Sequence, residues 1–217
     1  MKKIIGIFSI FILSAMLIPA LSLADVNDEL MRALRNNDIQ KVKEFISEGA
    51  DVNVIKTLDG WTPLMWATSY GYTEIVKLLL AKGAKVDVKS SNETTPLIQA
   101  SFKGYAEIAK LLIDKGANVN VKDADGWTPL LWAASFGNTE VAKILIDKGA
   151  TIDTRGPGSA TALWRAAFLG HNDTVKLLID KGADINVKDS SGYSVLGAAK
   201  SKNNMDTVQL LEDAGAK

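Results

Sequence analysis

Residues that could do acid–base or metal chemistry are scarce in this chain of 217 residues, which has one histidine and no cysteine. The lack of cysteine excludes disulfides, thiolate-bound zinc and a thiol nucleophile. The histidine, His171, stands two residues before Asp173, and a histidine with a carboxylate is the kind of pair that acts as a general base. A general base also needs a nucleophile and an orienting partner within reach, and neighbours in one turn do not form a triad. We therefore predict a structural His171 and no catalytic residue, and an enzyme using His171 and Asp173 is kept as an alternative.

Side chains that could ligate a hard cation recur once in each stretch of about 33 residues. They are Asn53, Asp87, Asn120, Asp153 and Asn186. Such regularity is typical of side chains that hydrogen-bond to loop backbone, so we predict no metal site. The glycine-rich segment 155–160 lacks the spacing and the Lys-Ser or Lys-Thr ending of a nucleotide loop. We interpret it as a flexible or contact-making loop and predict no cofactor.

Charged side chains are balanced, because 25 Lys and Arg stand against 25 Asp and Glu. Binding to nucleic acid calls for clustered basic charge, so we expect no nucleic-acid partner. Four lysines nevertheless recur, each just before a Gly-Ala pair: Lys82, Lys115, Lys148 and Lys181. A cation in the last turn of a helix complements the exposed carbonyls by about 0.3–1 kcal/mol, which explains these lysines without a ligand.

Two motifs repeat along the chain with one shared period. Gly-Ala recurs with one interval of 34 residues and then four of 33, at Gly49, Gly83, Gly116, Gly149, Gly182 and Gly215. Thr-Pro-Leu keeps the same step at 62–64, 95–97 and 128–130, and it weakens at 161–163 and 194–196. A period in this range indicates a solenoid. Each unit of a solenoid contacts only its neighbours, so the stack offers an extended surface in place of a central pocket.

The segment 125–154 shows how one unit is built. Its opening Asp-Gly pair predicts a tight turn. Thr128 and Pro129 then suit the N-cap and the first position of a helix. Gly137 ends that helix, and a second helix with a broad apolar side runs to Gly149. The sequence therefore predicts an all-α solenoid of units built as turn, helix, turn, helix and loop.

This pattern resembles the ankyrin repeat. The residues that carry the resemblance are Asp125-Gly126-Trp127-Thr128-Pro129-Leu130, Ala133-Ala134, Gly137 and Leu145 through Gly149-Ala150, and again Asp59 through Leu64. The resemblance implies six stacked helix-turn-helix units with hairpin loops, at about 25–58, 59–91, 92–124, 125–157, 158–190 and 191–217. The first and last units depart from the pattern, as terminal units with a wettable outer side do.

The resemblance also implies a place for partner binding, because the hairpin tips and the exposed side of the first helix form the concave surface that binds partners in ankyrin-repeat proteins. Residues spaced i, i+3 and i+4 share one side of a helix. Tryptophan and tyrosine are enriched among binding hot spots. The predicted partner-binding residues are Trp61, Trp66, Tyr70, Thr94, Phe102, Lys103, Trp127, Trp132, Phe136, Arg165, Phe168 and Leu169.

Two interpretations compete for the tryptophans of this set. Trp66 and Trp132 stand in a slot commonly held by a leucine between neighbouring first helices, so packing in the core is the alternative for them. Trp61 and Trp127 lie in turns with little beneath them, and we expect exposed indoles there. The predicted function is non-catalytic binding of a partner protein by a monomer. A carbohydrate or peptidoglycan binder using exposed tryptophans is the alternative.

The first 24 residues differ in composition from the repeats. Two lysines, an apolar run, Pro19 and the small residues Ser22 and Ala24 predict a secretory signal peptide cut after Ala24. The uncharged stretch 4–24 is also long enough to span a bilayer, so an uncleaved anchor is the alternative. The short leader looks bacterial, and we expect a periplasmic or secreted protein without stable membrane insertion. The identity of the partner cannot be read from the sequence.

Overall fold

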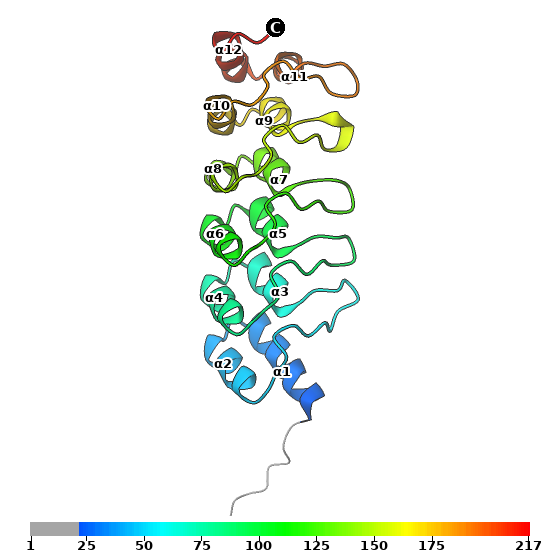
Figure 1. Ribbon diagram of the computed structural model, residues 1–217, viewed down its shortest axis with the longest axis vertical. Helices are drawn as coiled ribbons and strands as arrows, with labels where there is room; N and C mark the ends of the chain where they lie inside the picture. Colours follow the sequence, from blue (N-terminus) through cyan, green and yellow to red (C-terminus); the bar gives the residue numbers. More distant parts are fainter. Residues whose placement is uncertain (1–21) are drawn as a thin grey trace, which may run out of the picture.

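The structure, a computed structural model, describes residues 22–217, and the predicted leader up to residue 21 lies outside them. Residues 22–217 contain twelve α-helices and one short 3-10 turn. Figure 1 shows these helices as one elongated stack. The predicted all-α solenoid is confirmed. Within residues 22–217, no helix has the length and apolar content needed to cross a bilayer.

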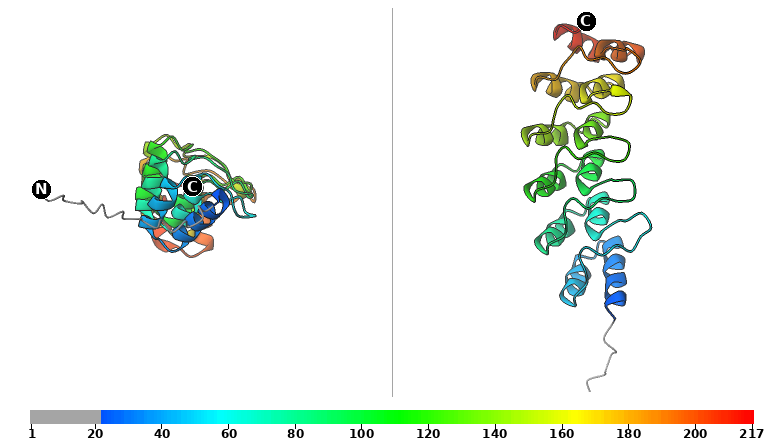
Figure 2. Two further views of the ribbon diagram at one scale, coloured as in Figure 1. Left: turned by 90° about the horizontal axis from the view of Figure 1, so that it is seen from below. Right: turned by 45° about the vertical axis from the view of Figure 1, so that its right-hand side comes forward.

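The helices form two columns, with a hairpin loop projecting sideways from each step of the stack (Figure 1). The first column consists of α1 (Leu23–Arg35), α3 (Pro63–Ser69), α5 (Pro96–Lys103), α7 (Pro129–Ser135), α9 (Ala162–Leu169) and α11 (Val195–Ser201). The second column consists of α2 (Ile39–Ser47), α4 (Thr73–Ala81), α6 (Ala106–Asp114), α8 (Thr139–Asp147), α10 (Asn172–Asp180) and α12 (Met205–Asp213). Seen end-on, the hairpins project together from one side of the helices (Figure 2).

The first helices begin where the Thr-Pro-Leu motif predicts. Thr128 is the N-cap of α7, and its Oγ1 accepts a hydrogen bond from the Leu131 N–H at 3.3 Å. Pro129 follows at the first helical position, where a missing N–H leaves no bond unmade. The predicted apolar stripe of this helix is buried, because Leu130 is 2% exposed and Ala133 and Ala134 are fully covered.

One apolar core runs through the stack. The leucine that recurs in the second helices is fully buried at each step, at Leu79, Leu112, Leu145 and Leu178. Alanines on the first helices let neighbouring helices approach closely, and Ala67, Ala100, Ala133 and Ala166 are also fully buried. The outer ends of the second helices carry the recurring lysines as C-cap residues, as at Lys148 in α8.

The recurring Asn and Asp residues bind backbone of the next unit. Asn53 Oδ1 accepts from the Lys85 N–H at 2.8 Å, and Asn120 Oδ1 accepts from the Thr151 N–H at 2.8 Å. Asp87, Asp153 and Asn186 likewise each accept a hydrogen bond from a backbone N–H of the following unit. The predicted loop hydrogen bonds are therefore confirmed.

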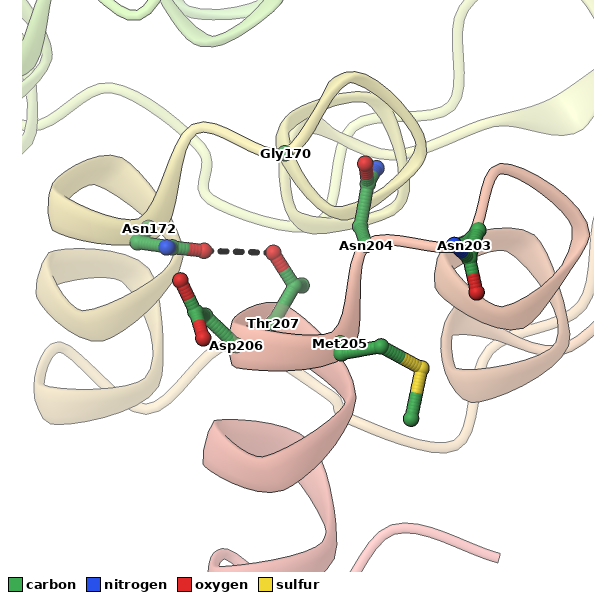
Figure 3. A pocket seen from close by; sticks show the side chains of 7 residues that line it. All are labelled: Gly170, Asn172, Asn203, Asn204, Met205, Asp206 and Thr207. Atoms are coloured by element: carbon green, nitrogen blue, oxygen red, sulfur yellow. Dashed lines mark hydrogen bonds between the residues drawn. The ribbon is translucent and has the colours of Figure 1, made fainter.

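A second ladder of contacts joins the turns between paired helices. His171 Nε2 lies 3.0 Å from the Ser135 carbonyl oxygen, and a carbonyl only accepts, so this nitrogen carries the proton. The ring also covers Gly137, which has a φ of +66° and no room for a Cβ, since one would lie 2.8 Å from the imidazole. Figure 3 shows Asn204 directed at the Gly170 turn in the same way one unit later. His171 thus joins two units.

The hairpin tips are bonded to one another except at one step. Ser91, Ala124 and Ser190 each donate a backbone N–H to the preceding hairpin, at 2.8–3.2 Å. Pro157 stands at the equivalent place between the fourth and fifth units, and proline has no N–H to donate. Arg155 stabilises this loop, because its Nη1 donates to the Ser159 carbonyl within it and to the Lys188 carbonyl at the following step of the stack. The segment 155–160 is therefore a contact-making loop.

Candidate functional site

The twelve predicted partner-binding residues lie along the first helices and the hairpins of the second to fifth units. We call the surface that they form the aromatic face. Four of its side chains are exposed: Tyr70, Lys103, Phe136 and Leu169. The other eight are half-buried: Trp61, Trp66, Thr94, Phe102, Trp127, Trp132, Arg165 and Phe168. Every predicted residue is thus at least partly accessible to solvent.

In the second unit the aromatic rings form a continuous row. The Trp61 and Trp66 rings meet edge to face with centroids 5.1 Å apart. Trp66 stacks on Tyr70 at 5.8 Å, and Tyr70 stacks on Tyr72 at 5.6 Å. Tyr72, at the start of α4, was not predicted as part of the site, because no rule of helical spacing links it to α3. The row fixes the orientation of Trp61 at the hairpin.

In the fourth unit the rings are held by a carboxylate. Trp127 stacks on Trp132 with centroids 4.6 Å apart. Asp123 binds both residues, because its Oδ2 accepts from Trp132 Nε1 at 2.9 Å and its Oδ1 accepts from the Trp127 N–H at 2.8 Å. Asp123 was not predicted either, although an aspartate at the start of a turn is a known acceptor for backbone N–H groups two residues on. Asp123 is a positioning residue of the aromatic face.

The expected exposure of the hairpin tryptophans was wrong. Trp61 and Trp127 are half-buried, because each hairpin folds back so that its indole lies against the tryptophan of its own first helix. Trp127 is covered further by the Arg165 guanidinium, 4.6 Å from its ring centroid. Trp66 and Trp132 are half-buried as well, so neither pair separates into a core residue and an exposed one.

A pocket of about 290 Å³ opens on the aromatic face over α5. Trp61, Phe102 and Trp132 form walls from three successive units, with Ile98, Gln99 and Lys103 among its other lining residues. We call it the α5 pocket. Gln99 is 7% exposed, and its Oε1 has no hydrogen-bond partner among the described residues. A buried amide oxygen without a partner costs about 1–3 kcal/mol.

A second pocket, of about 410 Å³, opens three units along the same side over α11. Trp164, Phe168, Tyr193 and Lys202 line it. Between the two pockets, the larger residues Trp164 and Arg165 stand where α5 has Ile98 and Gln99. The surface over α9 is therefore filled by the protein's own side chains.

Cations lie over the aromatic rings along this surface. Arg35 lies 5.6 Å from the Trp66 centroid, Lys103 lies 5.2 Å from Phe102, and Lys202 lies 4.7 Å from Phe168. Arg165 lies over Trp127, and its Nη2 donates to the Pro157 carbonyl at 2.9 Å. Burial lowers the pKa of Arg165 and the charge of Asp189 opposes that change, yet an arginine stays protonated in proteins.

Two other hollows lie at turns between paired helices and are polar. Figure 3 shows one lined by Asn172, Asn204 and Thr207, in which the Thr207 hydroxyl donates to Asn172. A similar one contains His171. Their polar groups serve contacts between units. In the same range no cluster of three or more His, Asp or Glu side chains could hold a metal ion.

The family model described as ankyrin repeats in three copies matches residues 30–123 and 116–189. The chain belongs to the ankyrin-repeat family. Ankyrin repeats generally mediate protein–protein interactions, and ankyrin-repeat proteins are typically non-catalytic. The aromatic face lies on the hairpins and first helices of these repeats.

Relatives match this ankyrin-repeat chain over short segments. Myotrophin of Xenopus tropicalis is 44% identical over 57 residues, which cover 26% of this chain and 47% of that protein. Mitochondrial disaggregase of Bos taurus is 49% identical over 55 residues, which cover 25% and 8%. The 2-5A-dependent ribonuclease of Mus musculus is 35% identical over 66 residues, which cover 30% and 9%. The chain thus matches less than half the length of each of these relatives.

Proposed function

We propose that this ankyrin-repeat protein is a monomeric, non-catalytic module that binds a partner protein through its aromatic face. The observation that carries the proposal is the open α5 pocket, in which three successive units contribute the apolar walls Trp61, Phe102 and Trp132. Stacked and hydrogen-bonded rings present a preformed surface, which lowers the ordering cost of binding. Large aromatic side chains supply the anchors most common in protein interfaces.

The contacts of His171 support a role without catalysis. Its Nε2 donates to the Ser135 carbonyl, and its ring covers the Gly137 turn. A general base needs a free nitrogen directed at a nucleophile. A turnover that is abolished by His171→Ala in a protein that remains folded would contradict the proposal.

We also propose export to the periplasm or the cell exterior, with cleavage after Ala24, on the strength of the N-terminal sequence. Ser22 is the N-cap of α1 and forms a capping box with Asp25. Cleavage would remove this cap, whose loss typically costs about 0.5–2 kcal/mol. Intact-mass measurement tests the proposal, because a species beginning at Asp25 supports cleavage and a full-length species supports a retained anchor.

The partner-binding proposal is tested with a photo-crosslinking residue placed on the aromatic face. Tyr70 and Phe136 are exposed there, whereas Met205 is exposed at the start of α12 and serves as the matched control. We expect discrete protein adducts from the first two positions in the cell that makes this protein, and their loss with Trp61→Ala plus Phe102→Ala. Adducts of equal yield at Met205 would contradict the proposal. Purified peptidoglycan that binds and blocks the adducts would favour the carbohydrate alternative.

A further inference from the structure

Charge is distributed unevenly between the two columns of helices. The first helices of the second to sixth units, α3, α5, α7, α9 and α11, contain no Asp or Glu. Four cations lie over the rings of this side: Arg35, Lys103, Arg165 and Lys202. The α5 pocket is therefore lined by apolar, neutral polar and positive side chains, whereas Asp189 also lines the pocket over α11.

Several lysines in or at the ends of the second helices have carboxylate partners, unlike these four. Lys77 Nζ lies 2.8 Å from both Glu74 and Glu107, and Lys148 Nζ lies 2.9 Å from Asp114. Within residues 22–217, no carboxylate oxygen comes within 4.0 Å of Arg35, Lys103, Arg165 or Lys202. Asp189 acts on Arg165 at longer range, while its Oδ1 accepts the Ser191 and Tyr193 N–H groups.

We infer, resting on the proposed function, that the partner presents an acidic, extended segment to the aromatic face. An apolar side chain of that segment enters the α5 pocket, and a carboxylate beside it pairs with Lys103 at the rim. Complementary charge of this kind selects the partner and its register on the surface.

The positions of the cations set a spacing for the carboxylates. Arg35, Lys103 and Arg165 belong to the first, third and fifth units. Stacked helices lie about 10 Å apart, so these cations recur about every 20 Å. An extended chain advances about 3.3 Å per residue, so carboxylates about six residues apart would reach successive cations. Lys202 in the sixth unit provides a further contact next to the pocket over α11.

The test is selection from a random library of twelve-residue peptides on the immobilised protein. Twelve extended residues span about 40 Å, which covers four units. We expect enriched peptides to hold Asp or Glu beside an aliphatic or aromatic residue. Reversal of charge by Lys103→Glu plus Lys202→Glu should weaken an enriched peptide at least about tenfold. The same reversal should shift a fresh selection toward Lys and Arg.

Lys82→Glu plus Lys115→Glu is the matched control. Both lysines are exposed C-cap residues of second helices, α4 and α6, and reversal changes the net charge of the protein equally. The control should bind the enriched peptide as the wild type does, and circular dichroism should show all variants folded. Equal weakening by both double variants would overturn the inference, because the effect would then come from net charge.

Other outcomes separate this inference from the proposed function. Enriched peptides without acidic residues that still require Trp61 would overturn the acidic chemistry and leave the aromatic face as the binding surface. Peptides that bind regardless of Trp61→Ala and Phe102→Ala would contradict the proposed function as well. A selection that enriches nothing, or binding only of soluble peptidoglycan fragments without dependence on Lys103, would also overturn the inference.

Discussion

The second and fourth units are near copies that differ in how they hold their tryptophans. Both begin with Asp-Gly-Trp-Thr-Pro-Leu. Asp123 binds the Trp127 backbone and the Trp132 indole of the fourth unit, and the two rings lie 26° from parallel. Asp123 stands two residues before the fourth unit, and Thr57 stands at the same place before the second unit, where its one oxygen accepts only the Trp61 N–H, at 3.0 Å. The buried Trp66 Nε1 has no partner among the described residues, and its ring lies 63° from that of Trp61.

The two units also differ in what the following unit places against them. Arg165 covers Trp127, whereas the equivalent Gln99 leaves Trp61 as a wall of the α5 pocket. The identical hexapeptides therefore present one open tryptophan and one covered tryptophan. In a solenoid, the accessibility of a side chain is determined by its neighbouring unit as much as by its own.

The largest effect should come from the core, where the two units are alike. Leu79 and Leu145 are both fully buried, so truncation of either to alanine should lower the free energy of unfolding by about 2–5 kcal/mol. Because both leucines lie between neighbours on each side, we expect nearly equal costs. Urea denaturation followed by circular dichroism measures them. A cost confined to one of the two units would show that their cores differ.

The next effect concerns binding and separates the two tryptophan pairs. Trp61→Ala should remove a wall of the α5 pocket and cost about 2 kcal/mol or more of binding free energy, as hot-spot truncations do. Trp127→Ala should change binding far less, because Arg165 already covers that ring. Titration of the crosslinked partner or an enriched peptide measures both. Equal losses would mean that Arg165 moves away from Trp127 on binding.

The sequence was sufficient for the features that one unit determines by itself. Thr128 caps a helix because the N–H that it accepts lies three residues away, and the apolar stripe that includes Leu130 follows the helical period of that same segment. The loop role of Asn120 could also be predicted, since its regular spacing matches one contact repeated at each step. The location of the aromatic face followed from the resemblance to ankyrin repeats, and its use for binding stays a prediction.

The sequence was insufficient where a contact joins different units or a turn and a helix. Trp127 is not exposed because Arg165, in the next unit, lies over it. The α5 pocket depends on Trp61 and Trp132, which lie in units on either side of it. Neither feature is visible in the pattern of one repeat. Both depend on which side chain happens to be larger at the same position one or two units away.

Exchange of the turn residues Asp123 and Thr57 should make the two units more alike in how they hold their tryptophans. Asp123→Thr removes the acceptor of Trp132 Nε1 and should cost about 1–3 kcal/mol, the usual penalty for an unpaired buried group. Thr57→Asp supplies an acceptor to Trp66 Nε1 and should stabilise the protein by up to about 1 kcal/mol. Urea unfolding measures both variants, and Asp59→Thr in the exposed tip is the control. Destabilisation by Thr57→Asp would show that the indole cannot reach the new carboxylate.

The smallest expected effect is on stability, depends on pH, and distinguishes the C-cap lysines of α4 and α8 in the same two units. Lys148 Nζ donates to Asp114 Oδ1 at 2.9 Å, and this bond lowers the pKa of Asp114 below its ordinary value of 3.8. Ser47 and Lys82 occupy the equivalent places of the first and second units, and Lys82 has no ion pair among the described residues. A carboxyl whose pKa is lower in the folded state adds stability above its unfolded pKa, and this is lost as the pH falls through the folded value. Lys148→Met should therefore lower the urea midpoint more than Lys82→Met at pH 7; the two midpoints should begin to converge below about pH 4 and meet once the pH lies below the pKa of folded Asp114. Both variants lose the same attraction of a cation to the helix end. The difference between their urea midpoints therefore isolates the contribution of the Lys148–Asp114 ion pair. A difference that persists at pH 2 would assign the effect to the lysine stem and its packing.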